Sequence, residues 1–154
     1  MFRFWWERRQ KMAKVSDVAN YIVHMTSVDP LKLQKLLYYS QGVFMAKYPN
    51  KLLFPEAIEA WDYGPVIPSI YKAYKKFGFS DIKPSNDVNF NKLERKEQEI
   101  VDMVLEYYGS KSGLDLMNRT HRETPWKTAY EKGKNNILNN AVMQKHFSEN
   151  IEFD

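Results

Sequence analysis

The stretch Glu59-Ala60-Trp61-Asp62-Tyr63-Gly64-Pro65-Val66-Ile67-Pro68 places two large aromatic residues, one glycine and two prolines in a short segment. In an extended backbone successive side chains alternate, so Trp61 and Tyr63 point to one face and Asp62 to the other. Gly64 permits backbone angles that other residues avoid, and Pro65 fixes the next φ. The segment therefore predicts a specific corner of the chain. Two interpretations stay open: a structural bend with Trp61 in the core, or an exposed aromatic recognition patch. Asp62 is then either a solvated charge or the partner of a basic residue.

Helical patterns lie on both sides of this corner. Apolar residues recur at helical spacing, and capping residues, first-turn prolines and C-terminal glycines mark the ends. We expect helices at about 15–25, 31–48, 68–77, 92–108, 113–118, 125–132 and 141–147, and short strands at about 57–61, 81–84 and 137–138. The expected N-caps are Ser16 or Asp17, Asp29, Ser112, Thr124 and Asn140.

These elements predict a mainly α-helical fold with a small β-sheet or hairpin, of the α+β class, in a single compact domain. The β-α-β alternation of a Rossmann or P-loop fold does not occur in the pattern. A chain of 154 residues is long enough for one hydrophobic core. We expect residues 1–11 to form a basic, aromatic N-terminal extension, and residues 12–154 to form the domain.

The composition of the chain excludes several kinds of functional site. The chain has no cysteine, which excludes disulfides, thiolate metal sites and a cysteine nucleophile, and which fits a cytoplasmic location. Aromatic residues reach 15%, so some rings are expected to line a groove or an interface. No run approaches the ~20 apolar residues of a membrane helix. The net charge of +4 is mild, and an acidic protein partner is compatible with it.

Residues 120–126, Thr-His-Arg-Glu-Thr-Pro-Trp, form a second dense segment. Two interpretations of His121 and Glu123 are open. In the functional one they form an acid–base pair or contact a ligand. In the structural one Glu123 lies near the positive N-terminus of the next helix. The structural interpretation is favoured, and Trp126 is then a core residue. No nucleophile lies beside an oriented base, and the three histidines show no metal-binding spacing, so the sequence predicts no catalytic residue, no metal and no cofactor.

Lys72, Lys75 and Lys76 alternate with Tyr74 and Phe77 along the expected third helix. Basic and aromatic side chains are interleaved in this way on phosphate-binding surfaces. The wet face of an amphipathic helix has the same pattern. Nucleic acid is therefore a disfavoured partner.

Three segments together resemble one family. Leu33-Gln34-Lys35-Leu36-Leu37-Tyr38-Tyr39-Ser40-Gln41-Gly42 resembles the "KLLYYAQG" helix of the Panacea domain, the SocA-like antitoxin family often labelled phage-associated. Residues 59–66 look like its "EAWxYGPV" signature, followed by a helix that bears Tyr71. Residues 120–126 are similar to its "TH-x-E-x-PW" element. The resemblance covers about 15–147 and leaves the extension 1–11 outside.

This resemblance implies a bacterial or phage-borne cytoplasmic antitoxin that neutralises a cognate toxin by direct protein–protein binding, with no catalytic site. Two alternatives are an adaptor that delivers its partner to a AAA+ protease, with residues 1–11 as the tether, and a nucleic-acid-binding regulator. The family motif marks residues with a structural or partner-binding role, and a structural role is favoured for Trp61, Gly64 and Pro65. The motif residues are Lys35, Tyr38, Tyr39, Gln41, Gly42, Trp61, Asp62, Tyr63, Gly64, Pro65, Tyr71, His121, Glu123, Pro125 and Trp126.

Overall fold

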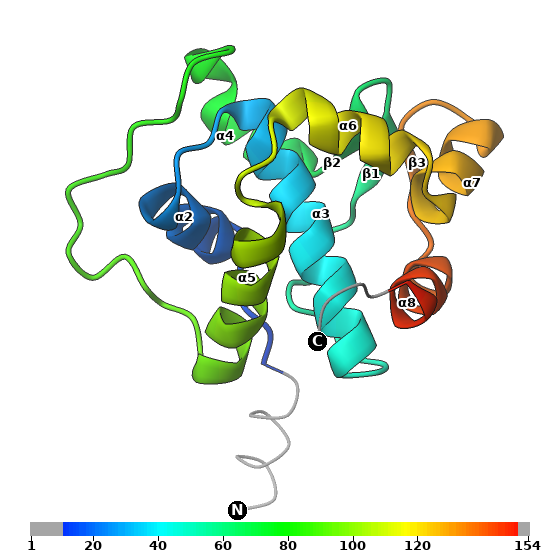
Figure 1. The fold of residues 1–154 in the computed structure, drawn as a ribbon, viewed down its shortest axis with the longest axis horizontal. Coiled ribbons are helices and arrows are strands. Elements are labelled where there is room, and N and C mark those ends of the chain that lie inside the picture. The colour runs from blue at the N-terminus through cyan, green and yellow to red at the C-terminus, as the bar shows by residue number, and fades with distance from the viewer. Residues whose placement is uncertain (1–10, 151–154) are drawn as a thin grey trace, which may run out of the picture.

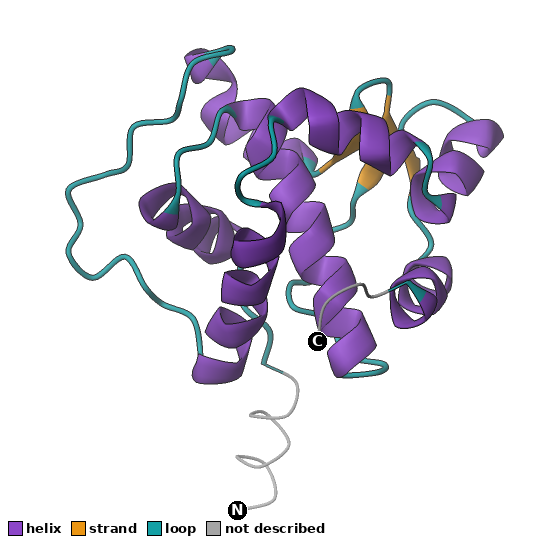
Figure 2. Ribbon diagram, viewed as in Figure 1, coloured by secondary structure: helices purple, strands orange, loops and turns teal. Residues whose placement is uncertain are grey.

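Helices dominate the described part of the chain (Figure 1, Figure 2). The structure is a computed structural model, and it describes residues 11–150. Its elements are α2 (Val15–Met25), α3 (Pro30–Lys47), β1 (Glu59–Trp61), β2 (Gly64–Val66), α4 (Pro68–Tyr74), the 3-10 turn η1 (Lys75–Phe77), α5 (Arg95–Tyr108), α6 (Gly113–His121), α7 (Thr124–Lys132), β3 (Asn136–Ile137) and α8 (Asn140–Glu149). The expected fold class, mainly helical with a small sheet, is confirmed.

The longest of these helices, α3, runs through the middle of the molecule (Figure 1). Pro30 occupies its first turn, and the Asp29 carboxylate accepts a hydrogen bond from the backbone N–H of Lys32 at 2.8 Å, as a cap does. Every side chain from Leu33 to Met45 is buried. A helix that is buried all round needs neighbours on each side. α3 accordingly packs against α2, α4, α5, α6, α8 and β2, and it organises the core.

The small sheet is antiparallel, with the strand order β2-β1-β3. Trp61 pairs with Gly64, so Asp62 and Tyr63 form the turn between β1 and β2. The expected corner is therefore the tip of a hairpin. β2 lies at an edge of the sheet, and an edge strand tolerates Pro65, which has no N–H to donate to a further strand.

One expected strand is wrong. Residues 81–84 lie in the loop between η1 and α5, which Figure 2 shows as a long coil on the outside of the molecule. Ile82 is buried, and its N–H donates to the carbonyl oxygen of Val28 at 2.8 Å. A buried isoleucine that makes a single backbone hydrogen bond looks like a strand residue in the sequence, although the segment does not pair with another strand.

Some helix caps also differ from expectation. Asp29 and Ser112 cap α3 and α6 as expected, and the Ser112 hydroxyl accepts from the N–H of Asp115. α2 begins after Lys14, which makes no side-chain cap, so Ser16 and Asp17 lie inside the helix. The caps of α7 and α8 are Glu123 and Asn139, one residue before Thr124 and Asn140. Ends of helices shift by a residue without a change in packing.

The remaining helices surround α3 on both sides. α2 and α5 cover one side, α8 covers the other, and α6 crosses over the top beside the sheet in the view of Figure 1. Among residues 11–150 no helix is long and apolar enough to cross a bilayer. The extension expected at 1–11 falls almost wholly outside the described residues, so its separation from the domain stays a prediction.

Candidate functional site

Two buried glutamines of α3, seven residues apart and therefore on the same side of the helix, bind the backbone of two other segments. Gln41 donates to the carbonyl oxygen of Phe54 and accepts from the N–H of Leu53, both at 2.7 Å. Gln34 does the same at Ile67, donating at 3.2 Å and accepting at 2.8 Å. Buried amides need such partners, because an unpaired one costs about 1–3 kcal/mol. Gln41 of the motif is therefore engaged inside the protein.

Lys35 lies fully buried next to the hairpin. Its Nζ donates to the carbonyl oxygen of Pro65 at 3.2 Å. Gly64 has φ +103°, and a β-carbon on it would lie 2.7 Å from Cε of Lys35 and 2.9 Å from Oγ1 of Thr120. Burial lowers the pKa of the Lys35 amine to about 7, with a smaller opposing effect from Asp29. The glycine of the signature thus makes room for the lysine of the helix motif.

The two tyrosines of the α3 motif share one carboxylate. The hydroxyls of Tyr38 and Tyr39 donate to Oε1 and Oε2 of Glu123 at 2.9 and 3.1 Å. Nε of Arg119 lies 3.7 Å from Oε2 of the same residue. Burial and the Glu123 charge raise the pKa of both hydroxyls, so each stays a donor. Glu123 therefore joins the end of α6 to the centre of α3.

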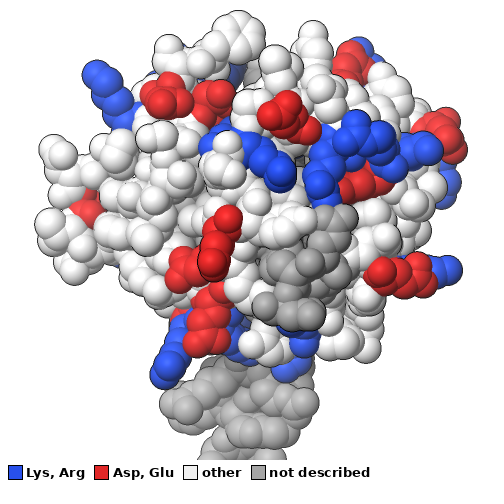
Figure 3. All heavy atoms as spheres, viewed as in Figure 1, with Lys and Arg blue, Asp and Glu red and all other residues white. Residues whose placement is uncertain are grey.

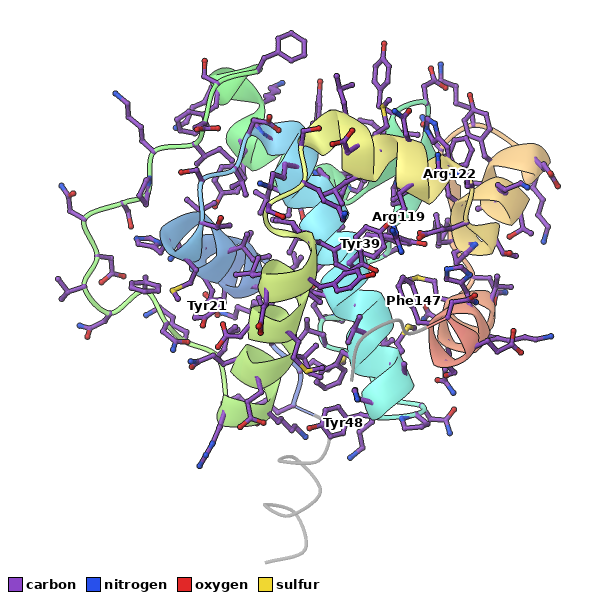
Figure 4. All side chains as sticks on the ribbon, viewed as in Figure 1. Tyr21, Tyr39, Tyr48, Arg119, Arg122 and Phe147 are labelled. Atoms are coloured by element: carbon purple, nitrogen blue, oxygen red, sulfur yellow. The ribbon has the colours of Figure 1, made fainter. Side chains whose placement is uncertain are left out.

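Gly42 of the motif is required by the packing of α8. The ring of Phe147 fills the space where a β-carbon on residue 42 would lie. Figure 4 shows Tyr39 and Phe147 reaching toward each other from α3 and α8, and their ring centroids are 6.0 Å apart. The small residue lets the two helices approach closely.

The hairpin tip is tied to α7 and to the segment after it. Nε1 of Trp126 donates to the carbonyl oxygen of Trp61 at 2.9 Å. Asp62 accepts from the hydroxyl of Tyr130 at 2.5 Å and pairs with Nζ of Lys134 at 3.0 Å. Hydrogen bonds from Tyr130 and Lys134 lower the pKa of Asp62. Asp62 is thus the partner of a basic residue, one of its two expected roles.

His121 and Glu123 take up different environments. The His121 ring packs on Trp126 with centroids 4.2 Å apart, whereas Glu123 receives Tyr38 and Tyr39. Burial lowers the pKa of His121 below its ordinary value. Pro125 is buried in the first turn of α7. An acid–base pair between His121 and Glu123 does not follow from this arrangement.

A groove opens beside the hairpin, at the end of the molecule where α4, α6, the start of α3 and the sheet meet (the upper edge in Figure 1). Its volume is about 630 Å³. Five residues of the family motif lie along it: Lys35, Trp61, Asp62, Tyr63 and Tyr71. The other lining residues are Pro30, Leu31, Gln34, Val66, Ile70, Tyr74, Gly78, Phe79, Leu114, Met117, Lys134 and Asn135.

The rim of this groove exposes large apolar side chains. Tyr63 is 69% exposed, Phe79 99% and Leu114 61%. Trp61, half buried, stands against Tyr71 with ring centroids 5.1 Å apart. Gly64 and Pro65 are buried, as a structural bend requires, and Tyr63 is exposed, but the expectation of Trp61 in the core is wrong, because Trp61 lines the groove. Exposed apolar side chains gathered around a concavity are typical of an interaction site.

Part of this groove could not be found from the sequence. Phe79 follows the helix-ending Gly78, and its aromatic type next to a turn is the only signal it carries. Leu114 and Met117 belong to α6, and Lys134 lies after α7, so only the fold brings them to the hairpin. Conversely, Tyr38, Tyr39, Gln41 and Gly42 are buried in contacts of α3 that lie outside the groove.

Charge is mixed over the face shown in Figure 3, with one group of basic side chains over the end of α6 and acidic ones beside it. Lys72, Lys75 and Lys76 are exposed on α4 and η1. Among the described residues no group of three His, Cys, Asp or Glu side chains has the arrangement of a metal site.

One protein family matches the chain. The family model described as "Antitoxin SocA-like, Panacea domain" matches residues 33–127, which is more than half of the sequence. All three motif segments, at 33–42, 59–66 and 120–126, fall within this range. Comparisons with curated proteins and with solved structures gave no match.

Proposed function

The chain belongs to the SocA-like Panacea domain family of antitoxins, and from this premise we propose that it neutralises a cognate toxin protein by binding it directly. The family supports an antitoxin-type role in general, and it suggests a non-catalytic one. The proposal adds the mechanism: a stable complex between two proteins, in which this chain covers a surface that the toxin needs.

The observation that carries the proposal is the aromatic groove. Tyr63, Phe79 and Leu114 expose their side chains to water around a concavity lined by Trp61 and Tyr71. Aromatic residues in such positions contribute most of the binding energy in protein interfaces, because their large apolar area leaves water on association. The groove is therefore proposed as the surface that meets the toxin.

The first test is co-expression with the protein encoded beside this chain. We expect that protein to stop growth when it is expressed alone, and we expect co-expression to restore growth and to give a complex that co-purifies. A neighbour that is not toxic, or a toxic neighbour that does not co-purify, would contradict the proposal.

A second test asks whether the rim of the groove is the surface that binds the toxin. Replacing Tyr63, Phe79 and Leu114 together by alanine should abolish rescue, since each residue lies on the rim. Met25 and Val88 are also exposed apolar residues, but they do not line the groove. The Met25→Ala/Val88→Ala variant is therefore the control, and it should rescue as the native chain does. Circular dichroism of both variants checks that the fold is intact.

We also propose a cytoplasmic location, because a chain without cysteine needs no oxidising compartment to fold. The protease-adaptor alternative depends on residues 1–11, of which 1–10 lie outside the described part of the chain. Deletion of residues 1–10 should leave toxin binding unchanged under both hypotheses. It should stop degradation of the toxin only if the extension is a tether.

A further inference from the structure

The helical segment that forms one wall of the groove also carries a cluster of exposed lysines beside the lining residues. Between Asp62 and Asp81 it has three lysines, Lys72, Lys75 and Lys76, and no acidic residue. All three are exposed. Within residues 11–150 none of them forms an ion pair. The same helical segment supplies Ile70, Tyr71, Tyr74 and Gly78 to the groove.

Helical spacing brings one of these lysines next to the groove wall. Residues three and four apart lie on one face of a helix. Tyr71 and Tyr74 line the groove, and Lys75, the next residue, begins the 3-10 turn η1 beside them without lining the groove itself. Lys72 and Lys76 are exposed on the same segment and do not line the groove either. Nζ of Lys76 lies 5.4 Å from the centre of the half-buried Phe77 ring, which packs against the core.

Asp62, on the opposite wall, already has a basic partner. Asp62 is the acidic residue among those that line the groove, and it is already matched by Lys134 at 3.0 Å and by the Tyr130 hydroxyl. Beneath the floor lies the amine of Lys35, whose hydrogen bond goes to a carbonyl oxygen. The lysines of α4 and η1 therefore add positive charge beside the groove, while the Glu59 carboxylate, which accepts from Nε1 of Trp61 at 2.9 Å, adds one negative charge on the side of the sheet.

We propose that the groove binds an acidic, apolar segment of the partner polypeptide: a large apolar side chain enters the concavity lined by Trp61 and Tyr71, and neighbouring Asp or Glu side chains lie near Lys72, Lys75 and Lys76. This inference rests on the proposed function and names the chemistry of the toxin segment. Opposite charges at the rim of an apolar contact steer association and fix its register.

A protein segment fits this site better than a nucleic acid. A nucleic-acid surface carries positive charge along a path that follows the phosphates. Here the three lysines occupy about one and a half turns of helix, beside a concave apolar wall, and the whole chain has a net charge of only +4. Nucleic acid is retained as an outcome that would overturn the inference.

The test starts with a library of short random peptides selected on the immobilised full-length chain. We expect the selected peptides to share a large apolar residue flanked by Asp or Glu. Their affinity should fall about tenfold or more in the variant Lys72→Glu/Lys75→Glu/Lys76→Glu. The control variant Lys92→Glu/Lys127→Glu/Lys145→Glu changes the net charge by the same amount at exposed lysines in the loop before α5, in α7 and in α8, and it should bind within about threefold of the native chain.

Three results would overturn the inference: basic or uncharged selected peptides, an equal loss of affinity in both variants, or a single-stranded oligonucleotide that binds more tightly than the peptides at the same salt.

Competition separates this inference from the proposed function. If the toxin binds and the selected peptide does not displace it, the groove chemistry is wrong and direct neutralisation stands. If the toxin does not bind at all, neutralisation is wrong, while the peptide selection still decides what the groove accepts.

Discussion

Nζ of Lys35 lies 3.2 Å from the carbonyl oxygen of Pro65, which joins the central helix to the hairpin through a buried amine. Taking an ammonium group out of water is costly, and burial lowers the pKa of Lys35 from 10.5 to about 7. Between these two values the unfolded chain binds a proton that the folded chain has released. The free energy of unfolding therefore rises with pH across this window, and below about pH 7 the contribution is constant and at its most destabilising.

Lys35→Met should remove this pH dependence. Each pH unit between about 7 and 10 should add at most about 1.4 kcal/mol to the stability of the native chain relative to the variant. Urea unfolding of both proteins across that range measures the difference. Because all other groups titrate alike in the two proteins, parallel stability curves would show that Lys35 keeps its ordinary pKa.

Gly64→Ala should destabilise the fold strongly. The new β-carbon would meet Lys35 and Thr120, and φ +103° is unfavourable for alanine. Strain and overpacking together should cost about 2–5 kcal/mol. Gly78→Ala is the matched control, since residue 78 also has positive φ, at +59°, but has no atom within 4 Å of a β-carbon. It should cost about 1 kcal/mol, and equal losses in the two variants would contradict a steric role for Lys35.

Gly42→Ala should destabilise the protein even though alanine favours a helix by about 1 kcal/mol over glycine. The added methyl group occupies the space of the Phe147 ring, so α8 must move away from α3. We expect a net loss of about 1–3 kcal/mol in thermal or urea unfolding. In a Phe147→Ala background the same change should cost much less, and an unchanged cost would show that the ring is not the obstacle.

Removing the Glu123 carboxylate should cost more than removing either tyrosine hydroxyl. Tyr38→Phe or Tyr39→Phe deletes one hydrogen bond to a charged acceptor, worth about 1.5–3 kcal/mol. Glu123→Ala leaves two buried hydroxyls without this acceptor. Adding both phenylalanines to Glu123→Ala should therefore restore part of the lost stability. A triple variant less stable than Glu123→Ala alone would contradict this account.

The helices could be predicted because their signals are local. Asp29-Pro30 marks the start of α3 and Ser112 the start of α6, and both signals depend only on nearby backbone. The hairpin was harder to foresee. Its second strand is Gly-Pro-Val, and only its position at the sheet edge makes the proline acceptable. Ile82 gave a false strand signal because a buried loop residue and a residue of a buried strand are both apolar, and the sequence does not distinguish them.

The candidate site could be predicted only in part. Trp61 and Tyr63, which are close together in sequence, indicated the hairpin tip. Its groove depends on Phe79, Leu114 and Lys134, which reach it from separate elements. The α3 motif was equally visible, but a sequence does not show that Tyr38 and Tyr39 face a buried carboxylate supplied by a residue more than eighty positions away.

The glutamine contacts of α3 have a consequence for protein engineering. Gln34 and Gln41 bind backbone N–H and carbonyl groups at Ile67, Leu53 and Phe54, so these bonds do not depend on which side chains the bound segments carry. The rim residues Tyr63 and Phe79 take no part in these hydrogen bonds. A combinatorial library that randomises the rim and keeps the two glutamines should therefore yield folded scaffolds with new specificities.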